Sequence, residues 1–416
     1  MSEYLINIGK KAKAAYTEVS RLDNKTKDDI LRKAADLLCE DAAYIISENV
    51  KDYERAKANG MSEGILDRLF LDEKRIASMA DGLRDLADLP SSLGEVMDSF
   101  VRDDGLRIDK VRVPMGVIGI IYESRPNVTS DAFGITFKMG NACILRGGSD
   151  AINSMIAIAA SLKKALSFYG VNPDAVQVIE NTDREIVNEF LRLDRYVDVL
   201  IPRGGAGLIN NVVNNATIPV IKTGTGNCHI YVDKAADLAK AVPIIVNAKT
   251  QRLGVCNSCE SLVIHKDILG KSLPLICEAL APHSIEIRGD KDAKAVCPQI
   301  NDATEEDFAT EYLARIISVK TVSSLSEAIE HINLYSTNHS DSIITEDADA
   351  AAKFLNEIDS ACVYHNASTR FTDGFEFGLG AEIGISTQKL HARGPMGLNE
   401  MTTYKYKIYG NGNIRK

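Results

Sequence analysis

Apolar residues in the first part of the chain recur at helical spacing. Between Lys25 and Ala58 they fall three and four positions apart, with acidic residues and lysines between them, which is the pattern of amphipathic helices. The pattern changes at Val96–Val113, where two strand-like stretches flank Asp103-Asp104-Gly105. A glycine-containing turn between two such stretches predicts a β-hairpin that projects from the body of the protein.

From Pro114 onward, short apolar stretches alternate with helical ones, so the expected fold class is α/β with parallel sheets. Because the stretches are apolar without alternation, we expect helices to cover both faces of each sheet. The predicted strands are Gly116–Tyr122, Ala142–Arg146, Val176–Ile179, Val197–Ile201, Pro219–Lys222, Glu260–His265, Ser284–Ile287, Ile316–Val319, Ser342–Thr345 and Ala361–Tyr364.

The end of the chain and its length complete the expected organisation. Thr402–Tyr409 alternates tyrosines and isoleucine with Lys405 and Lys407, which predicts a final strand with one covered face. The chain has 416 residues, more than the about 100–200 residues of an ordinary domain. We therefore expect two α/β domains, the second starting near residue 255.

Charge and cysteine content narrow the possible partners. Lys and Arg number 48 against 58 Asp and Glu, for a net charge of −10, which disfavours nucleic acid and anionic membranes as partners. The longest uncharged apolar stretches, Ala151–Leu162 and Val113–Tyr122, are shorter than the about 20 residues that span a bilayer. The eight cysteines are thinly scattered, so we expect a reducing, cytoplasmic location.

Cys256 is the candidate nucleophile. It follows a predicted helix, lies in a glycine-containing turn and directly precedes a strand at the expected domain boundary, where clefts form. Nearby Lys249 and Arg252 would favour a thiolate. Three alternatives compete: a buried structural cysteine, a redox pair with Cys259, and a zinc site. No second Cys-x-x-Cys pair exists, so no metal site is predicted.

Glycine turns follow several predicted strands and suggest a nucleotide. Arg146-Gly147-Gly148-Ser149 and Arg203-Gly204-Gly205 each precede a helix, and Thr223-Gly224-Thr225-Gly226 follows a third strand. Backbone N–H groups in such turns, with helix N-termini behind them, favour phosphate groups. The Gly-x-Gly-x-x-Gly fingerprint is absent, so a standard Rossmann turn is not expected.

Two polar segments of the second domain carry further candidates. His331 and His339 lie eight residues apart across a helix end, which is no metal-ligand spacing, so a satisfied polar loop is favoured. Arg370 follows a predicted strand and has the chemistry to bind a carboxylate or phosphate.

Five segments together resemble the glutamate-5-semialdehyde dehydrogenases, the proline-pathway branch of the aldehyde dehydrogenase superfamily, over nearly the whole chain. They are Val113–Asn127, Ile144–Ser149, Arg252–Asn257, Val322–Ile343 and Ala392–Gly397. The resemblance implies that Cys256 attacks the acyl phosphate of L-glutamate 5-phosphate, that phosphate leaves, and that NADPH reduces the thioester to glutamate 5-semialdehyde.

The same resemblance implies roles for individual residues. Oxyanion donors would be the Cys256 backbone N–H and the side-chain amide of Asn127. Arg146 would lie near the adenosine ribose, where a guanidinium favours the 2′-phosphate of NADPH. The implied cofactor-binding set is Arg146, Gly147, Gly148, Ser149, Gly204, Gly205 and Glu311, and the candidate substrate-binding set is Arg125, Arg252, His339 and Arg370.

The resemblance also implies a domain plan and partners. Residues 1–95 and 114–254 would form the cofactor-binding domain and 255–378 the catalytic domain, with 379–399 returning toward the former. Residues 96–113 and 400–416 would form a flap whose free edge a second copy covers in a homodimer or homotetramer. Contact with glutamate 5-kinase is left open.

Two departures from the resembled sequences bear on the chemistry. Leu253 stands where relatives commonly have proline, which changes loop stiffness without touching the nucleophile. Lys222 lies near the position where hydrolytic aldehyde dehydrogenases have a glutamate base. The absence of that glutamate suits an enzyme whose thioester is exchanged with phosphate rather than with water. A hydrolytic aldehyde dehydrogenase and a redox-regulated binding protein using Cys256 and Cys259 remain the competing hypotheses.

Overall fold

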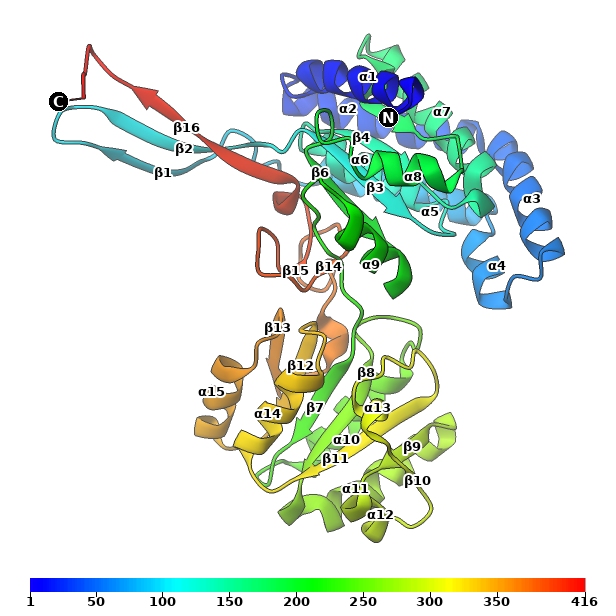
Figure 1. The fold of residues 1–416 in the computed structure, drawn as a ribbon, viewed down its shortest axis with the longest axis vertical. Coiled ribbons are helices and arrows are strands. Elements are labelled where there is room, and N and C mark those ends of the chain that lie inside the picture. The colour runs from blue at the N-terminus through cyan, green and yellow to red at the C-terminus, as the bar shows by residue number, and fades with distance from the viewer. Residues whose placement is uncertain (416) are drawn as a thin grey trace. The chain divides into compact units, whose positions relative to one another are not determined.

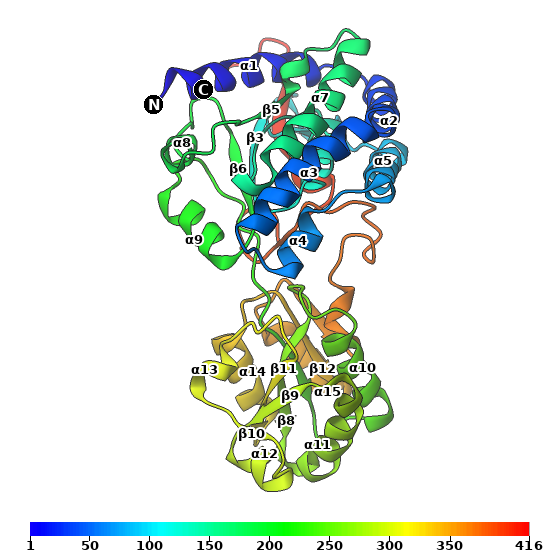
Figure 2. The same ribbon diagram turned by 90° about the vertical axis from the view of Figure 1, so that its right-hand side faces the viewer.

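The computed structural model describes residues 1–415, which divide into two compact units. The first comprises Met1–Lys222, Leu379–Gly384 and the chain from Met396 onward, and the second comprises Thr223–Gly378 and Ile385–Pro395 (Figures 1 and 2). Within the described residues, no helix is both long enough and apolar enough to cross a membrane.

The first unit is built around a parallel four-stranded sheet. Its strands lie in the order β5-β4-β3-β6, and β3 pairs with both neighbours in parallel. The strands are β3 (Val117–Tyr122), β4 (Ala142–Arg146), β5 (Val176–Val178) and β6 (Val199–Arg203). Every residue of β3 is buried, as its apolar sequence predicts.

Helices cover both faces of this sheet (Figure 2). The helices of this unit, some of which pack on other helices rather than on the sheet, are α1 (Glu3–Val19), α2 (Asn24–Glu40), α3 (Ala42–Ala58), α4 (Glu63–Leu69), α5 (Glu73–Asp88), α6 (Val128–Lys138), α7 (Ile152–Phe168), α8 (Arg184–Phe190) and α9 (Ala206–Asn215). Leu5 and Ile8 of α1 share one core with Ile121 and Ile144. On the opposite face, the Tyr122 hydroxyl meets Thr129 of α6 at 2.8 Å.

The predicted hairpin and tail strand form one antiparallel sheet, hereafter the flap. It consists of β1 (Val96–Val101), β2 (Arg107–Pro114) and β16 (Thr402–Tyr409), in the order β1-β2-β16. Figure 1 shows it extending away from the helices of the first unit. Beyond Thr402 every residue of β16 is exposed, so within one chain the predicted covered face is not covered.

The second unit contains a seven-stranded sheet in the order β10-β9-β11-β8-β7-β12-β13. All of its pairings are parallel. The strands are β7 (Cys228–Val232), β8 (Cys259–His265), β9 (Glu286–Gly289), β10 (Asn301–Asp302), β11 (Ile316–Val322), β12 (Ser340–Ile344) and β13 (Cys362–His365).

Alternate residues of the central strands face different helical layers. Ile230 and Val232 share a core with α10 and α11, whereas Tyr231 between them stacks on Phe354 of α15 with ring centroids 6.3 Å apart. The helices are α10 (Leu238–Thr250), α11 (Lys266–Leu280), α12 (Lys291–Val296), α13 (Glu305–Phe308), α14 (Leu325–Tyr335) and α15 (Ala348–Glu357).

The division of the chain differs from the sequence-based expectation. The second unit begins at Thr223 rather than near residue 255, because β7 pairs with β8 and β12, and α10 packs into the same core. Residues 379–399 do not return as one segment. Ile385–Pro395, with the short pair β14 (Ile385–Ser386) and β15 (Gly394–Pro395), belongs to the second unit.

Candidate active site

Cys256 lies on the loop between α10 and β8, which we call the nucleophile loop (Gln251–Ser258). Its side chain is partly exposed, whereas Cys259, the first residue of β8, is 0% exposed. Burial raises the pKa of the Cys259 thiol to about 12. A buried, protonated thiol is a poor redox partner, so the arrangement favours Cys256 alone as the reactive cysteine.

Gly226, directly before β7, packs against the nucleophile loop. A Cβ at this position would lie 1.4 Å from the carbonyl oxygen of Cys256, so only glycine fits. The Gly226 backbone N–H also donates to Glu311 Oε1 at 2.6 Å. Burial raises the pKa of Glu311, and this hydrogen bond opposes the rise. Through one glycine, the structure therefore brings together Cys256 and Glu311, both predicted from sequence.

Asn257 ties the nucleophile loop to the segment that carries Arg370. Its side-chain amide donates to the carbonyl of Thr372 at 2.9 Å, and its own carbonyl accepts from the Thr369 hydroxyl at 2.8 Å. These two bonds fix the short helical turn Thr369–Phe371 against the loop.

Arg370 and Arg252 form the cationic surroundings of the loop. The Arg370 guanidinium donates from its Nε to Gln251 Oε1 at 2.9 Å, and Gln251 is the residue before Arg252. Burial, and then repulsion from Arg252, lower the pKa of Arg370, while Asp373 and Cys256 act in the opposite direction. Two guanidinium groups close enough to repel each other, next to a thiol, are suited to bind a phosphate or carboxylate.

Lys249 does not supply the positive charge expected of it. Its ammonium pairs with Glu260 at 2.5 Å, and both side chains are 0% exposed. Glu260 in turn accepts the backbone N–H of Leu313 at 3.3 Å, two residues beyond Glu311. The pair therefore supports the segment that carries Glu311 rather than the thiol.

His339, a predicted substrate-binding residue, is 0% exposed. Its Nδ1 lies 2.8 Å from the Ser340 hydroxyl, and burial lowers its pKa to about 4. His339 therefore lies behind the nucleophile loop, with its Nδ1 3.8 Å from the Sγ of Cys228, and its role in substrate binding stays a prediction.

The Arg146–Ser149 turn follows β4 in the first unit. Arg146 is partly buried, donates to the Thr182 carbonyl at 3.3 Å, and has its pKa lowered by burial. A Cβ at Gly147 would lie 2.0 Å from the sulfur of Met155, and one at Gly148 would lie 2.0 Å from Asp150 Oδ1. A side chain at either glycine would therefore have to displace the end of the Met155 or Asp150 side chain.

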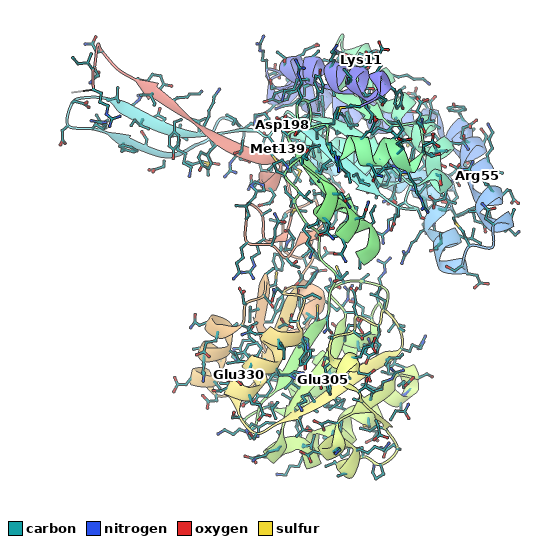
Figure 3. All side chains as sticks on the ribbon, viewed as in Figure 1. Lys11, Arg55, Met139, Asp198, Glu305 and Glu330 are labelled. Atoms are coloured by element: carbon teal, nitrogen blue, oxygen red, sulfur yellow. The ribbon has the colours of Figure 1, made fainter. Side chains whose placement is uncertain are left out.

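The N-terminus of α7, expected to favour a phosphate, is satisfied from within the chain. Asp52, 0% exposed, accepts the backbone N–H of Ser154 at 2.8 Å and the side-chain amide of Asn153 at 2.8 Å. Arg55, labelled in Figure 3, pairs with Asp52 and also donates to the Ser149 carbonyl at 2.6 Å. A permanent internal carboxylate therefore caps this helix.

The turn before α9 differs from this, because the carboxylate that it binds, that of Glu123, is exposed to solvent. Glu123, at the end of β3, accepts the backbone N–H of Gly205 at 2.9 Å, and a Cβ at Gly204 would lie 2.5 Å from the same carboxylate oxygen. The turn thus presents a backbone donor to an oxygen acceptor, which is what a phosphate requires.

The remaining predicted residues of the first unit, Arg125 and Asn127, lie between β3 and α6. Arg125 is exposed, and the Asn127 amide donates to Asp131 at 2.9 Å. The predicted role of Asn127 at the oxyanion stays a prediction. Among residues 1–415, no three His, Cys, Asp or Glu side chains are grouped to hold a metal ion.

The chain belongs to the aldehyde dehydrogenase family, whose model matches residues 3–310 and 303–406. Membership implies an enzyme that acts on a small molecule with a nicotinamide cofactor. Within the family, the chain is 59% identical over 414 residues to the gamma-glutamyl phosphate reductase of Lachnospira eligens, covering 100% of both. It is 55% identical over 407 residues to the gamma-glutamyl phosphate reductase of Caldanaerobacter subterraneus, covering 98% of each.

Solved structures agree with this assignment. The crystal structure of gamma-glutamyl phosphate reductase from Thermotoga maritima matches with a TM-score of 0.97 at 50% identity, covering 99% of this chain and 100% of that one. An acetylating aldehyde dehydrogenase from Geobacillus thermoglucosidasius matches with a TM-score of 0.69 at 18% identity, covering 100% and 98%, and shares the fold. The predicted aldehyde-dehydrogenase-like α/β fold is confirmed.

Sequence reasoning missed three residues that shape the site: Glu123, Cys228 and Asn257. Cys228 is 0% exposed and donates its thiol hydrogen to the Cys256 carbonyl at 3.1 Å. Glu123 and Cys228 meet their partners only through the parallel pairing of strands distant in sequence. The sequence shows that Asn257 follows the proposed nucleophile, but it gives no signal of the hydrogen bond from Asn257 to Thr372.

Proposed function

We propose that the protein reduces L-glutamate 5-phosphate to L-glutamate 5-semialdehyde with release of phosphate, using NADPH, as a step of proline biosynthesis. The observation that carries the proposal is the partly exposed Cys256 on a loop shared with Arg252, tied to the Arg370 segment, and contacted by the glycine that also binds Glu311. The named relatives, identical at 59% and 55% of positions, support this substrate.

In the proposed reaction, the Cys256 thiolate attacks the acyl carbon of the substrate. A carbon–sulfur bond forms and the bond to the phosphate oxygen breaks, so that a thioester and inorganic phosphate result. The phosphate carries negative charge, for which Arg252 and Arg370 supply guanidinium donors. The backbone N–H of Cys256 is the donor proposed for the oxyanion that develops at the acyl oxygen.

The residues present fit a nicotinamide dinucleotide. When bound, this cofactor supplies the hydride that reduces the thioester. Glu311 is proposed to accept hydroxyl groups of the nicotinamide ribose, and the Gly205 N–H, which here holds a carboxylate oxygen, to donate to the pyrophosphate. Arg146 is proposed to favour NADPH over NADH by binding the 2′-phosphate.

Self-association through the flap is part of the proposal. The flap exposes apolar and aromatic side chains on both edge strands, including Phe100 at 50%, Val101 at 63%, Tyr406 at 55% and Ile408 at 59%. An exposed apolar edge strand is a ready template for pairing with another chain. We therefore propose a homodimer or homotetramer in which a second copy covers the flap.

The test is phosphate-dependent reduction of NADP⁺ with glutamate 5-semialdehyde, which runs the proposed reaction in reverse. We expect Cys256→Ala to abolish it, while the wild-type protein stalls when phosphate is omitted and resumes when phosphate is added. Full activity of Cys256→Ala would refute the nucleophile. Brisk turnover without phosphate would favour a hydrolytic aldehyde dehydrogenase instead.

A further inference from the structure

A buried thiol lies directly behind the nucleophile loop. Cys228, the first residue of β7, is 0% exposed, and its Sγ donates to the Cys256 carbonyl oxygen at 3.1 Å. Burial, followed by repulsion from the carboxylate of Asp341, raises the pKa of Cys228 well above its ordinary value. The thiol therefore keeps its hydrogen at neutral pH and remains a donor.

The Cys256 carbonyl is held from a second side by Gly226. The Gly226 backbone lies so close that a Cβ there would be 1.4 Å from this oxygen. The peptide unit after Cys256 is thus enclosed between a glycine backbone and a thiol donor. Rotation of this peptide would break the sulfur hydrogen bond or collide with Gly226.

A chain of buried polar groups continues from Cys228. Its Sγ lies 3.8 Å from His339 Nδ1, which lies 2.8 Å from the Ser340 hydroxyl. Ser340 contacts the Thr372 hydroxyl at 2.6 Å, and Thr372 contacts the Tyr364 hydroxyl at 2.7 Å. His339, Ser340 and Thr372 are all 0% exposed, so water does not compete for these bonds.

The polar chain returns to the nucleophile loop at its far end. The Thr372 carbonyl accepts the side-chain amide of Asn257, the residue after Cys256. The carbonyl of Cys256 and the side chain of Asn257 are therefore connected to the two ends of one buried network. A shift at either end is opposed by the other.

We infer that Cys228 is a positioning residue for the nucleophile, acting through its hydrogen bond to the Cys256 carbonyl. His339 and Thr372 support Cys228 in this role. The inference rests on the proposed function. Cys228 forms no bond to substrate and undergoes no redox step. Its loss would leave substrate binding in place and misplace the reacting sulfur, so kcat falls while KM stays nearly constant.

The first experiment compares Cys228→Ala with Cys228→Ser, because serine keeps a donor at this position. We expect kcat to fall about tenfold in Cys228→Ala, the size of one lost hydrogen bond, with KM within about twofold of wild type. Cys228→Ser should recover most of the rate. Cys297→Ala is the matched control, since Cys297 is another buried thiol of the same unit, 2% exposed, and its kcat should not change.

A second measurement needs neither substrate nor cofactor. Alkylation of Cys256 by iodoacetamide at neutral pH, followed by mass spectrometry, should slow several-fold in Cys228→Ala and stay near the wild-type rate in Cys228→Ser and Cys297→Ala. If the reductase activity were absent but alkylation followed this order, the proposed function would be wrong while the positioning role stood.

Three outcomes would overturn the inference: an unchanged kcat in Cys228→Ala, an equal loss in the alanine and serine variants, or the same loss in Cys297→Ala. Should Cys228→Ala not fold, Thr372→Val and Thr372→Ser make the same comparison. Valine removes the hydroxyl while keeping the shape, and serine keeps it. Equal rates in these two variants would also refute the network.

Discussion

Gly226 and Cys256 are in direct backbone contact: a Cβ on Gly226 would lie 1.4 Å from the Cys256 carbonyl oxygen. The same glycine donates its N–H to Glu311 at 2.6 Å. One residue without a side chain therefore sets the distance between the proposed nucleophile and the carboxylate proposed to bind the ribose.

Gly226→Ala should displace the nucleophile loop. We expect a loss of activity of at least about a hundredfold, because small displacements of reacting groups have such effects, and a destabilisation of about 1–3 kcal/mol from overpacking. Steady-state kinetics and urea unfolding measure the two. Gly254→Ala is the control, since Gly254 lies in the same loop with nothing within 4 Å of its Cβ position; similar losses in both variants would contradict the argument.

Glu123→Gln should strengthen cofactor binding. In this structure the Glu123 carboxylate accepts the Gly205 N–H at 2.9 Å, at the position proposed for the pyrophosphate, so its negative charge competes with and repels the phosphates. We expect the Kd of NADP⁺, measured by calorimetry, to fall several-fold. Glu330→Gln, on the exposed surface of α14 (Figure 3), should change nothing. Weaker binding in Glu123→Gln would show that the carboxylate assists the cofactor.

His331→Phe should make the protein less sensitive to mild acid. Burial, followed by repulsion from His229, lowers the pKa of His331 from 6.5 to about 3. Between these values the unfolded chain binds a proton that the folded chain does not, so the free energy of unfolding falls as the pH drops below 6.5. This loss amounts to about 2 kcal/mol at pH 5.

Urea unfolding of wild type and His331→Phe at pH 7 and pH 5 measures the effect. The pH dependence of the free energy of unfolding must be compared between the two proteins, because Glu260 acts in the opposite direction. Burial raises the pKa of Glu260 to about 7, so this carboxyl stabilises the fold as the pH falls, equally in both proteins. Phenylalanine suits the site because His331 already packs against the rings of Phe308 and Tyr335, with centroids 5.3 and 4.7 Å away. An equal acid sensitivity of both proteins would contradict a buried neutral His331.

Val101→Glu combined with Ile408→Glu should dissociate the proposed oligomer. Both side chains are exposed, at 63% and 59%, on the two edge strands of the flap, and a second copy would bury the new charges at high free-energy cost. Light scattering after gel filtration reads the mass. Leu334→Glu, at a site 71% exposed on α14, is the control and should leave the mass unchanged; an unchanged mass in the flap variant would exclude this surface as the interface.

The sequence predicted those helices and strands whose identity is encoded in local signals, such as turn residues and the alternation of polar and apolar positions. The hairpin and Thr402–Tyr409 were found because turn residues and alternation are local signals. Helix α6 was missed because residues Val128 to Lys138 are all buried except Asp131, so it has no polar face to reveal its period. Strand β7 was missed because it is short and its second residue, His229, is polar yet fully buried.

The structure brings several of the residues proposed from the sequence close to one loop, while their supporting contacts were not predicted. Cys256, Glu311, Arg252 and Arg370 lie near this loop of the second unit, and their roles stay predictions. The burial of His339 and the pairing of Lys249 with Glu260 were not foreseen, because burial depends on which strands become neighbours. Glycines were expected at turns, but the contact of Gly226 with Cys256 follows from the pairing of β7 with β8.

The first unit takes its last strand from the end of the chain. Tyr406 of β16 pairs with Lys110 of β2, and the buried amide of Asn141 donates to the Met401 carbonyl at 2.9 Å. Residues as far as Tyr409 must therefore leave the ribosome before the flap can be completed, and until then β2 keeps an open edge beside the nascent chain. Synthesis from the N-terminus thus gives the second unit the opportunity to fold first, although it is encoded later.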